Sequence, residues 1–221
     1  MVLTLLGMNG SQPFRSVQWA LKMKGVAYEE QFVMPGSKKA SGSRNPAYLA
    51  MVSTGQIPAI KDGDFVLSQS PAILLYLAEK HGWEDLYPTD IRTRALIQQY
   101  MHWHHHNTRM VSAGLFAPVV LKFPAPPGAK RAIKFALNTI ERTYLGDRAY
   151  LCADTPTLAD LLAYEELVQC LPKYCDLLDF GLYPNISAWM ERMAKLPAHE
   201  EVHDKILKKL GSLFKKPQAK L

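Results

Sequence analysis

The chain has 221 residues, of which 48% are hydrophobic and 21% are charged, and this composition is typical of a folded globular protein and not of a disordered one. No apolar run approaches the roughly 20 residues that cross a bilayer, and residues 1–7 lack the basic leader of a secretory signal. The formal net charge is +6, but the six lysines from Lys205 onward equal this whole excess, so no basic groove for nucleic acid is indicated.

Residues 1–81 alternate strand and helix signals, which predicts a mixed α/β domain. Phe14, Val17 and Leu21 recur at helical spacing between the two strand signals. Because a helix must carry the chain from the first strand to the second, these two strands are expected to be parallel. The expected elements are strands over 2–6 and 28–33, a helix over 13–24, a loop over 35–45 and a short helix that begins at Asn45-Pro46.

Residues 56–70 predict a β-hairpin that leads into a helix over 70–81. Asp62-Gly63 is expected to form its two-residue turn, and Ser70-Pro71 is typical of an N-cap followed by proline at the first helical position. Pro58 cannot donate to a ladder, so backbone polar groups stay free beside it. Since the helix N-terminus attracts a carboxylate, this region indicates a site for a small acidic peptide.

Residues 90–210 show only helix signals, and the Gly, Asp and Pro residues of 82–89 indicate a linker. Thr157 and Asp160 form a variant of the capping box at the start of one helix. Helices are expected over 90–113 and 129–144, from Thr157, from Pro184-Asn185 to Pro197 and over 198–210, followed by a basic tail over 211–221. The predicted fold class is therefore α/β plus all-α, with a thioredoxin-like β-α-β, β-β-α domain over 1–81 and an all-helical domain over 90–210.

Four motifs carry a family resemblance: Ser11-Gln12-Pro13, the hairpin, Thr157-Leu158-Ala159-Asp160-Leu161, and Pro184-Asn185-Ile186-x-x-Trp189. Together they span nearly the whole chain and resemble the glutathione transferases. The serine before Gln-Pro is similar to the theta class, and Leu196-Pro197-x-His199-x-x-Val202-His203 resembles its plant members. The resemblance implies an N-terminal domain that binds glutathione, a helical domain that forms most of the electrophile pocket, a homodimer, and no metal.

Ser11 is the expected catalytic residue under this resemblance. A free thiol has a pKa near 8.5, so only a small fraction of it is thiolate at neutral pH. A serine hydroxyl that donates to the glutathione sulfur, helped by the helix N-terminus that follows, would favour the thiolate. The alternative interpretation is that Ser11 only caps that helix.

The resemblance also implies the residues that hold glutathione. Ile57, before a cis Pro58, would pair its backbone with the cysteinyl part, and Gln69 and Ser70 would hold the γ-glutamyl end. Gln56 would contact the glycyl carboxylate. The loop after the second strand carries an apparent three-residue insertion relative to theta proteins. Ser43 falls where those proteins have a histidine, and Lys38, Lys39 or Arg44 could meet the glycyl carboxylate instead.

The electrophile pocket is expected to include His106, Arg109, Met110 and Ala113. Arg109 matches a family arginine that reaches the glutathione sulfur. His106 stands where theta proteins often have aspartate, which either raises the local positive potential or removes a salt bridge that orients Arg109. His102, His104, His105 and His106 also suggest a metal site, but no second carboxylate or cysteine lies at ligand spacing, so no metal is expected.

These residues predict a transferase that adds the glutathione thiolate to hydrophobic electrophiles. A glutathione-dependent peroxidase and a non-catalytic ligand-binding protein are the alternatives. Cys152, Cys170 and Cys175 form no Cys-x-x-Cys pair, which suits a reducing compartment, and the cytoplasm is the expected location. The C-terminal Ala219-Lys220-Leu221 is close to a peroxisomal address, which keeps the peroxisome as a second location.

Overall fold

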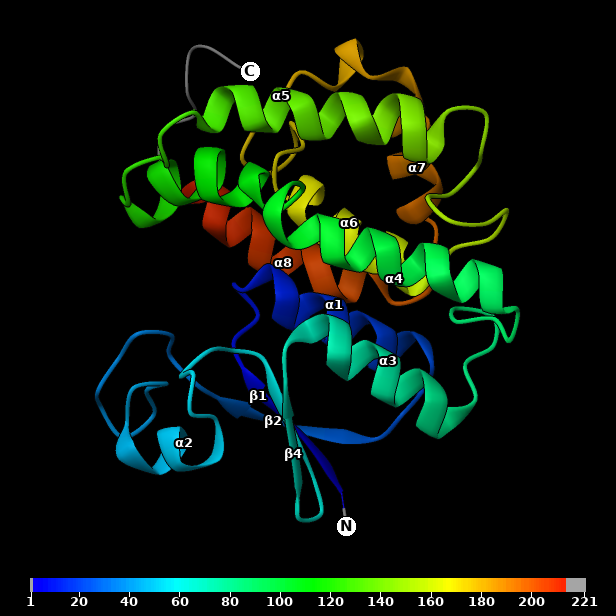
Figure 1. Cartoon of the computed structure of the whole chain (residues 1–221). Coiled ribbons are helices and arrows are strands. Elements are labelled where there is room, and N and C mark those ends of the chain that lie inside the picture. The colour runs from blue at the N-terminus through cyan, green and yellow to red at the C-terminus, as the bar shows by residue number, and fades with distance from the viewer. Residues whose placement is uncertain (1, 214–221) are drawn as a thin grey trace. The chain divides into compact units, whose positions relative to one another are not determined.

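A computed structural model describes residues 2–213 of the chain (Figure 1). The chain divides into two compact units, Met1–Gly82 and Trp83–Leu221. Each unit is described by itself. The basic residues of the predicted tail from position 214 onward, and the tripeptide Ala219-Lys220-Leu221, lie outside the described residues.

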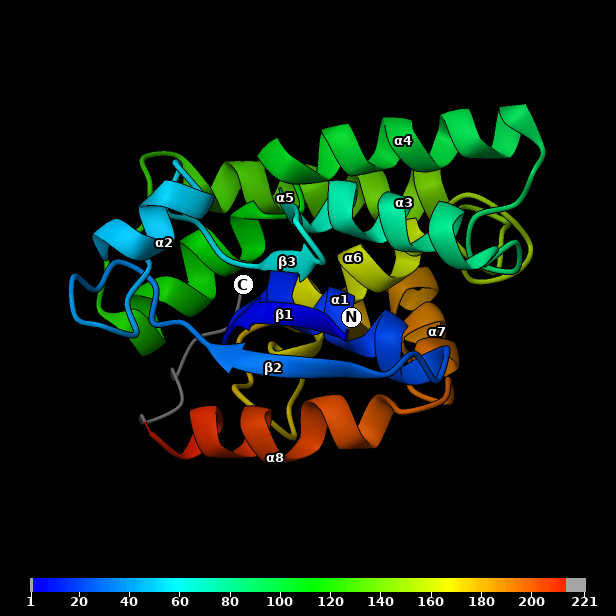
Figure 2. The same ribbon diagram turned by 90° about the horizontal axis from the view of Figure 1, so that it is seen from below.

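The first unit contains a four-stranded mixed sheet in the order β2-β1-β3-β4. Its elements are β1 (Leu3–Gly7), α1 (Gln12–Met23), β2 (Tyr28–Phe32), α2 (Pro46–Met51), β3 (Ala59–Asp62), β4 (Phe65–Ser68) and α3 (Ser70–His81). Strand β1 pairs in parallel with β2 and antiparallel with β3, and it lies between them in Figure 2. The predicted thioredoxin-like order and the parallel first pair are confirmed.

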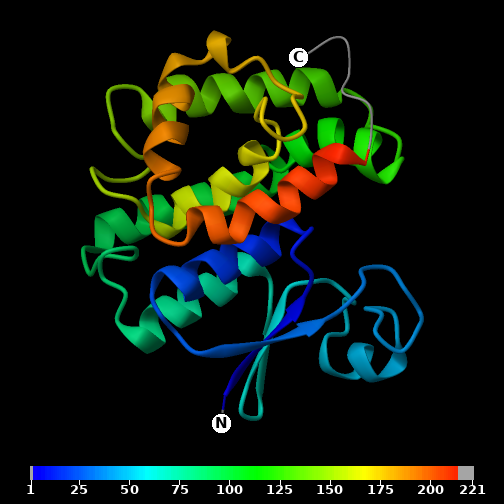
Figure 3. The same ribbon diagram turned by 180° about the vertical axis from the view of Figure 1, so that it is seen from behind.

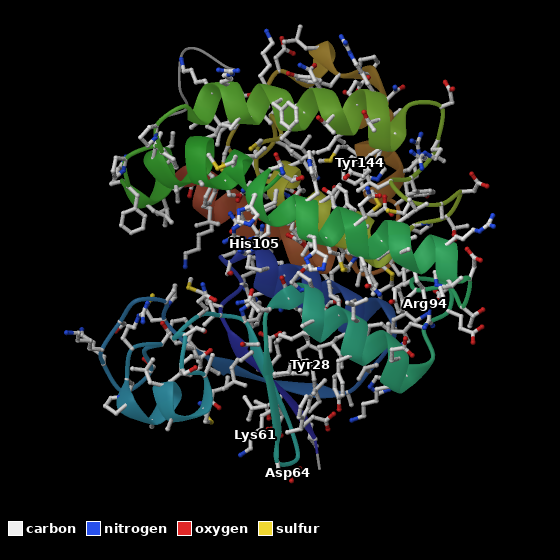
Figure 4. The ribbon with its side chains drawn as sticks, viewed as in Figure 1. Tyr28, Lys61, Asp64, Arg94, His105 and Tyr144 are labelled. Carbon is white, nitrogen blue, oxygen red and sulfur yellow. The ribbon has the colours of Figure 1, made fainter. Side chains whose placement is uncertain are left out.

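The hairpin turn differs from the prediction by one residue. Asp62 pairs with Phe65, so the two turn residues are Gly63 and Asp64 and not Asp62 and Gly63. Gly63 has φ 68° and Asp64 has no positive φ, which is the pattern of a type II′ turn with glycine first. Asp64 stands at the tip of the hairpin in Figure 4, at the opposite end of β4 from its junction with α3.

Helices α1 and α3 pack beside each other on the sheet and run in the same direction (Figures 1 and 3). The predicted apolar positions of α1 explain this packing, because Phe14, Val17 and Leu21 are all buried. Gly7 must stay small, since a Cβ built on it would lie 2.4 Å from the Phe14 ring. The first unit therefore buries the helix that begins just after Ser11.

The second unit is all-helical, as predicted. Its elements are α4 (Ile91–His106), η1 (Ser112–Leu121), α5 (Ala129–Thr139), η2 (Ile140–Leu145), α6 (Leu158–Val168), η3 (Phe180–Leu182), α7 (Pro184–Met193) and α8 (His199–Ser212). Helix α5 and η2 follow each other without a break, and both η1 and η2 have the wider turns of a π-helix.

One helix boundary of the second unit was predicted wrongly. The helix expected over 90–113 ends at His106, because the amide of Asn107 bonds back to the carbonyls of Trp103 and His104 and the chain then turns. The segment predicted as a linker, 82–89, is partly buried. Trp83, Leu86 and Tyr87 are buried, and the Leu86 carbonyl accepts from the amide of Leu158.

Helix α6 forms the core of the second unit, and every one of its residues is buried. The predicted capping box is present at its start, where the Asp160 carboxylate accepts from both the amide and the hydroxyl of Thr157 at 2.8 Å. The same carboxylate accepts from the Leu151 amide and from the indole N–H of Trp189 in α7, each at 2.9 Å. One buried carboxylate therefore ties α6 to two other segments, and its four donors offset the desolvation that raises its pKa.

Two buried pairs of polar side chains join α6 to α8. Nε2 of His199 lies 2.7 Å from the Tyr164 hydroxyl, and Nε2 of His203 lies 2.8 Å from the Glu165 carboxylate. The rings of the two histidines stack with centroids 4.5 Å apart. Burial, followed by the neighbouring His203, lowers the pKa of His199 to about 4, so His199 is neutral at physiological pH.

None of the helices within residues 2–213 combines the length and the apolar composition that crossing a membrane requires.

The buried His199 predicts a loss of stability in mild acid. The unfolded histidine binds a proton near pH 6.5 and the folded one only near pH 4, so the unfolded state binds more protons between these values. Lowering the pH from 6.5 should therefore reduce the free energy of unfolding by up to about 1.4 kcal/mol per pH unit. Urea titrations at pH 7 and pH 5 measure this, and His199→Gln should show a smaller difference than the wild type.

His102→Gln is the matched control, since His102 is exposed on α4 and the same residue types are exchanged. It should keep the wild-type difference between the two pH values. If His199→Gln also keeps it, the acid sensitivity arises elsewhere.

Candidate functional site

The register of the sheet brings three segments of the first unit to one edge. Leu6 of β1 pairs with Ala59 of β3, and Ala59 pairs with Ser68 of β4. The end of β1, the start of β3 and the end of β4 therefore lie side by side. The residues that follow or precede these ends are Ser11, Gln56, Ile57, Pro58, Gln69 and Ser70, so the predicted glutathione residues, apart from Ser43, come from one edge of one sheet.

Part of the backbone before β3 has no partner among the described residues, as the position of Pro58 predicted. The peptide bond between Ile57 and Pro58 is cis. Ile57 makes no backbone hydrogen bond within residues 2–213, while its side chain packs against the cluster that contains Tyr48 and Val52. The Tyr48 hydroxyl donates to the Gln56 carbonyl at 2.6 Å, and burial raises the pKa of Tyr48 to about 12. The Tyr48 hydrogen bond and the packing of the Ile57 side chain thus hold the segment in place, while the Ile57 amide and carbonyl keep no partner within residues 2–213.

The junction between β4 and α3 holds a strained residue. Gln69 has φ 76° and ψ 111°, a conformation that a residue with a side chain rarely adopts and that is concentrated at functional sites. Its side-chain amide donates to Oε1 of Gln56 at 2.7 Å, which links the two ends of the hairpin. Two predicted site residues are therefore in direct contact.

Ser70 occupies the first position of α3, and Gln69, not Ser70, is the N-cap. The prediction of a Ser70 cap is therefore wrong. Ser70 as a whole is 4% exposed, and its hydroxyl makes no hydrogen bond to any residue that the structure describes. The first amides of α3 also lack partners within the helix. A hydroxyl and adjacent amides without partners form a suitable site for a carboxylate.

Ser11 occupies the N-cap position of α1, but its side chain does not cap the helix. Its amide donates to the Met8 carbonyl and its own carbonyl accepts from Arg15, each at 3.0 Å. Both backbone polar groups of Ser11 are thus hydrogen-bonded. Its partly exposed hydroxyl has no partner among the described residues. This finding removes the interpretation of Ser11 as a side-chain cap.

The loop over 35–45, which carries the apparent insertion, is held together by hydrogen bonds within itself and to the adjacent Met34. The Ser43 amide donates to the Met34 carbonyl at 2.9 Å, and its fully buried hydroxyl accepts from the Gly36 amide at 3.0 Å. Ser43 therefore holds the loop together and does not offer its hydroxyl at the surface. The Arg44 guanidinium lies beside Gly55, since a Cβ built on Gly55 would be 3.1 Å from its Nη1.

The predicted pocket residues of the second unit do not share one helix. His106 ends α4, Arg109 lies in the turn that follows, Met110 lies in the helical residues just before η1, and Ala113 lies in η1. The single helix predicted over 90–113 therefore does not carry all four residues.

Arg109 has a carboxylate partner that the sequence analysis missed. Its Nη1 donates to the buried Glu166 of α6 at 3.0 Å, and the Ser112 hydroxyl donates to the other Glu166 oxygen. The Arg109 side chain stays 39% exposed. Arg109 therefore has an orienting salt bridge that does not involve position 106, and the two alternatives raised by His106 stay open.

His104 is also near Glu166 but does not form an ion pair with it. Its Nε2 is 3.8 Å from the carboxylate, and burial lowers its pKa to about 3. The exposed rings of His105 and His106 contact each other edge to face, and His105 is labelled in Figure 4. In the part of the chain from 2 to 213, no group of three or more His, Cys, Asp or Glu side chains is arranged to hold a metal ion.

Comparison with known proteins agrees with this architecture. Residues 5–85 match the family model of the glutathione S-transferase N-terminal domain, and residues 116–197 match that of the C-terminal domain. Human glutathione S-transferase theta-2 is 34% identical over 224 residues, which cover 93% of this chain and 87% of the human protein. Rat glutathione S-transferase theta-2 is 32% identical over 219 residues, with the same coverage of 93% and 87%.

The crystal structure of human glutathione transferase theta-2 in complex with glutathione has a TM-score of 0.81 at 32% identity, covering 98% of this chain and 93% of that one. A glutathione transferase from Bombyx mori has a TM-score of 0.85 at 23% identity, which shows the shared fold alone. The matched domains and the shared length with theta enzymes show that this chain belongs to the glutathione S-transferase family, in its theta class, and is a glutathione transferase with glutathione as co-substrate.

Proposed function

We propose that Ser11 activates glutathione by donating a hydrogen bond to its thiolate, and that the thiolate then attacks a hydrophobic electrophile. The observation that carries this proposal is a serine at the start of α1 whose hydroxyl has no partner within residues 2–213. A hydrogen bond to the charged form lowers the pKa of a thiol, and the dipole of α1 acts in the same direction. A decrease of about two pKa units corresponds to roughly 2.7 kcal/mol in favour of the thiolate.

The remaining contacts to glutathione follow from the free groups at the same sheet edge. The Ile57 amide and carbonyl would pair with the cysteinyl backbone, and the Ser70 hydroxyl and amide would bind the γ-glutamyl carboxylate. Gln69 would accept from the γ-glutamyl amine. Its neutral amide gives no ion pair, unlike the glutamate that theta proteins often have there.

Two groups are available for the glycyl carboxylate. Gln56 is exposed beside the free backbone, and the guanidinium of Arg44 lies next to Gly55. Of the cations considered from sequence, we assign this role to Arg44, since its position beside residue 55 supports it. We leave the buried Ser43 out of the binding set.

Arg109 is proposed to stabilise negative charge on the glutathione sulfur, with His106, Met110 and Ala113 lining the electrophile pocket. Glu166 orients the guanidinium but leaves part of it exposed for a ligand. A homodimer and a location in the cytoplasm belong to the same proposal. The three cysteines are free and buried, which is consistent with a reducing compartment.

A peroxidase reaction would use the same groups, because it also begins with the glutathione thiolate. Assays with aryl halides, benzyl and epoxide electrophiles and cumene hydroperoxide compare the two activities directly. Conjugation rates that exceed hydroperoxide reduction support the transferase assignment.

Ser11→Ala should reduce turnover by about 100-fold, which is roughly 2.7 kcal/mol of barrier, and should keep most of the affinity for glutathione. The reason is that only the charged sulfur gains from the hydroxyl. The pKa of bound glutathione, followed by thiolate absorbance in the ultraviolet, should rise in parallel. Ser16→Ala is the control, because that hydroxyl donates to the Pro13 carbonyl within α1. Unchanged turnover in Ser11→Ala would remove Ser11 from the mechanism.

Substitutions at the γ-glutamyl anchor should change binding in opposite directions. Ser70→Ala should raise the KM for glutathione roughly tenfold by removing a hydrogen bond to a charged group, and should change stability by less than about 0.5 kcal/mol because this hydroxyl does not cap α3. Gln69→Glu should lower the KM by adding an ion pair with the γ-glutamyl amine. Weaker binding by Gln69→Glu would show that the site depends on the neutral amide pair of Gln56 and Gln69.

Arg109→Lys should retain more activity than Arg109→Gln, because it keeps the charge beside Glu166. Arg109→Gln should raise the pKa of bound glutathione and lower kcat, and it leaves a buried carboxylate without its cation, which costs about 3–5 kcal/mol of stability. Adding Glu166→Gln to Arg109→Gln should restore stability but not the thiol pKa. A double variant that recovers both would indicate that Arg109 acts only on folding.

A further inference from the structure

The segment between β1 and α1 contains an Asn-Gly pair that the proposed function does not use. Asn9-Gly10 directly precedes Ser11 and is the only Asn-Gly pair in the sequence. The two residues are the middle of a turn that closes when the Ser11 amide donates to the Met8 carbonyl at 3.0 Å. The position of Ser11 therefore depends on the backbone geometry of Asn9 and Gly10.

The two groups that can react with each other at an Asn-Gly pair have no partners among the described residues. Asn9 is exposed, and its side-chain amide makes no hydrogen bond within residues 2–213. The same holds for the main-chain amide of Gly10. A Cβ built on Gly10 would meet one described atom within 4 Å, the Cε of Met8 at 3.1 Å. The space around Gly10 is therefore open enough for its nitrogen to approach Cγ of Asn9.

Arg15 polarises the peptide group that contains this nitrogen. Arg15 is fully buried, and its Nη1 donates to the Asn9 carbonyl at 3.1 Å. This carbonyl and the Gly10 amide belong to the same peptide group. A cation at the oxygen stabilises the anion that remains when the nitrogen loses its proton. Because the deprotonated nitrogen is the nucleophile, the contact with Arg15 favours its attack.

The other asparagines of the chain lack this combination. The residue after each is proline, which has no amide proton, or threonine or isoleucine, whose branched side chain hinders an attack. These asparagines are Asn45, Asn107, Asn138 and Asn185.

Asp62-Gly63 also has the glycine that such a reaction needs, but its carboxyl group is protected. Hydrogen bonds from Lys80 and Tyr76 lower the pKa of Asp62. An ionised carboxylate is a poor target for a nucleophile, so Asp62 is expected to stay unchanged and serves as an internal reference.

We propose that Asn9 is a site of spontaneous modification, at which it cyclises with Gly10 and then opens to isoaspartate. The Gly10 nitrogen forms a bond to Cγ of Asn9, the bond from Cγ to the side-chain nitrogen breaks, and ammonia leaves with the Gly10 amide proton. Water then cleaves the succinimide at one of its two carbonyls. Cleavage at the former main-chain carbonyl gives isoaspartate, and Arg15 favours it because it stabilises the carboxylate that forms there.

The modification should inactivate the enzyme, and this consequence rests on the proposed role of Ser11. Isoaspartate adds one methylene carbon to the main chain inside the turn that positions Ser11, and it adds a negative charge. A displacement of about 1 Å is enough to cost about 100-fold in rate. The new charge would also raise the pKa of a thiol bound at Ser11. The enzyme would therefore lose activity with age.

The test incubates the full chain for several days at mildly alkaline and at mildly acidic pH. Peptide mass and methylation by a protein-isoaspartate methyltransferase identify the product. The peptide with Asn9 should gain the mass of an amide-to-acid exchange and accept methyl groups, faster at alkaline pH because the nitrogen must lose its proton. The peptide with Asp62 should accept none. Turnover with glutathione should fall in proportion to the isoaspartate at Asn9.

Gly10→Ala should slow both changes at least about tenfold, because a methyl group hinders the attack. Alanine suits the backbone there, since Gly10 has no positive φ. Asn9→Gln should keep the turnover of fresh wild type and lose none of it on incubation. Asn9→Asp adds the charge without the longer main chain, so it should lose less turnover than fully converted wild type. Asn138→Gln is the matched control and should age as the wild type does.

Loss of turnover while Asn9 stays intact, or isoaspartate at Asn9 with unchanged turnover, would overturn the proposal. Equal ageing of Gly10→Ala and the wild type would do the same. The mass and methylation readouts do not depend on the role of Ser11. Unchanged turnover in Ser11→Ala would therefore refute the proposed function, while isoaspartate would still form at Asn9.

Discussion

The proposed glutathione site depends on the absence of one backbone hydrogen-bond donor. Pro58 precedes β3 and cannot extend the ladder that β3 forms with β1, so the pairing stops at Ala59. Ile57 then lies at the edge of the sheet, and its amide and carbonyl have no partner within residues 2–213. A tripeptide could add to this edge in the same way as a further strand, which would give affinity from main-chain hydrogen bonds. In the proposed complex, glutathione would supply the partner that the Ile57 backbone lacks.

Side chains of the first unit fix the groups around this edge through hydrogen bonds, and other polar groups at the same edge stay available to a ligand. Tyr48 fixes the carbonyl of Gln56, and Gln56 in turn holds the side chain of Gln69. The strained backbone at Gln69 directs the start of α3 toward the same edge. Ser11 and Ser70 are the two hydroxyls that this arrangement leaves without partners among the described residues. A preorganised site of this kind loses little conformational freedom on binding, which favours affinity and the orientation of the thiol.

The second unit uses buried carboxylates for a different purpose. Asp160 joins α6 to α7 and to the segment at Leu151, and Glu166 joins α6 to Arg109 and Ser112. Each buried charge is stabilised by several donors, because an unpaired one would cost far more than packing could offset. Glu166 also holds a partly exposed guanidinium in one orientation, which the proposed role of Arg109 requires.

The sequence by itself determined the features that local chemistry controls. The order of elements, the interruption at Pro58, the capping box at Thr157 and Asp160 and the position of Ser11 before α1 all follow from residues close together in the chain, where the backbone responds to proline, turn residues and caps. Only the tertiary structure decided the rest. The break after His106, the pairing of Arg109 with Glu166 and the burial of Ser43 depend on residues from distant segments or on a compact loop, and no local pattern encodes them. That the Ser11 hydroxyl has no partner within residues 2–213 is a finding of the same kind, because serine fits an N-cap equally well whether or not its side chain bonds to the helix.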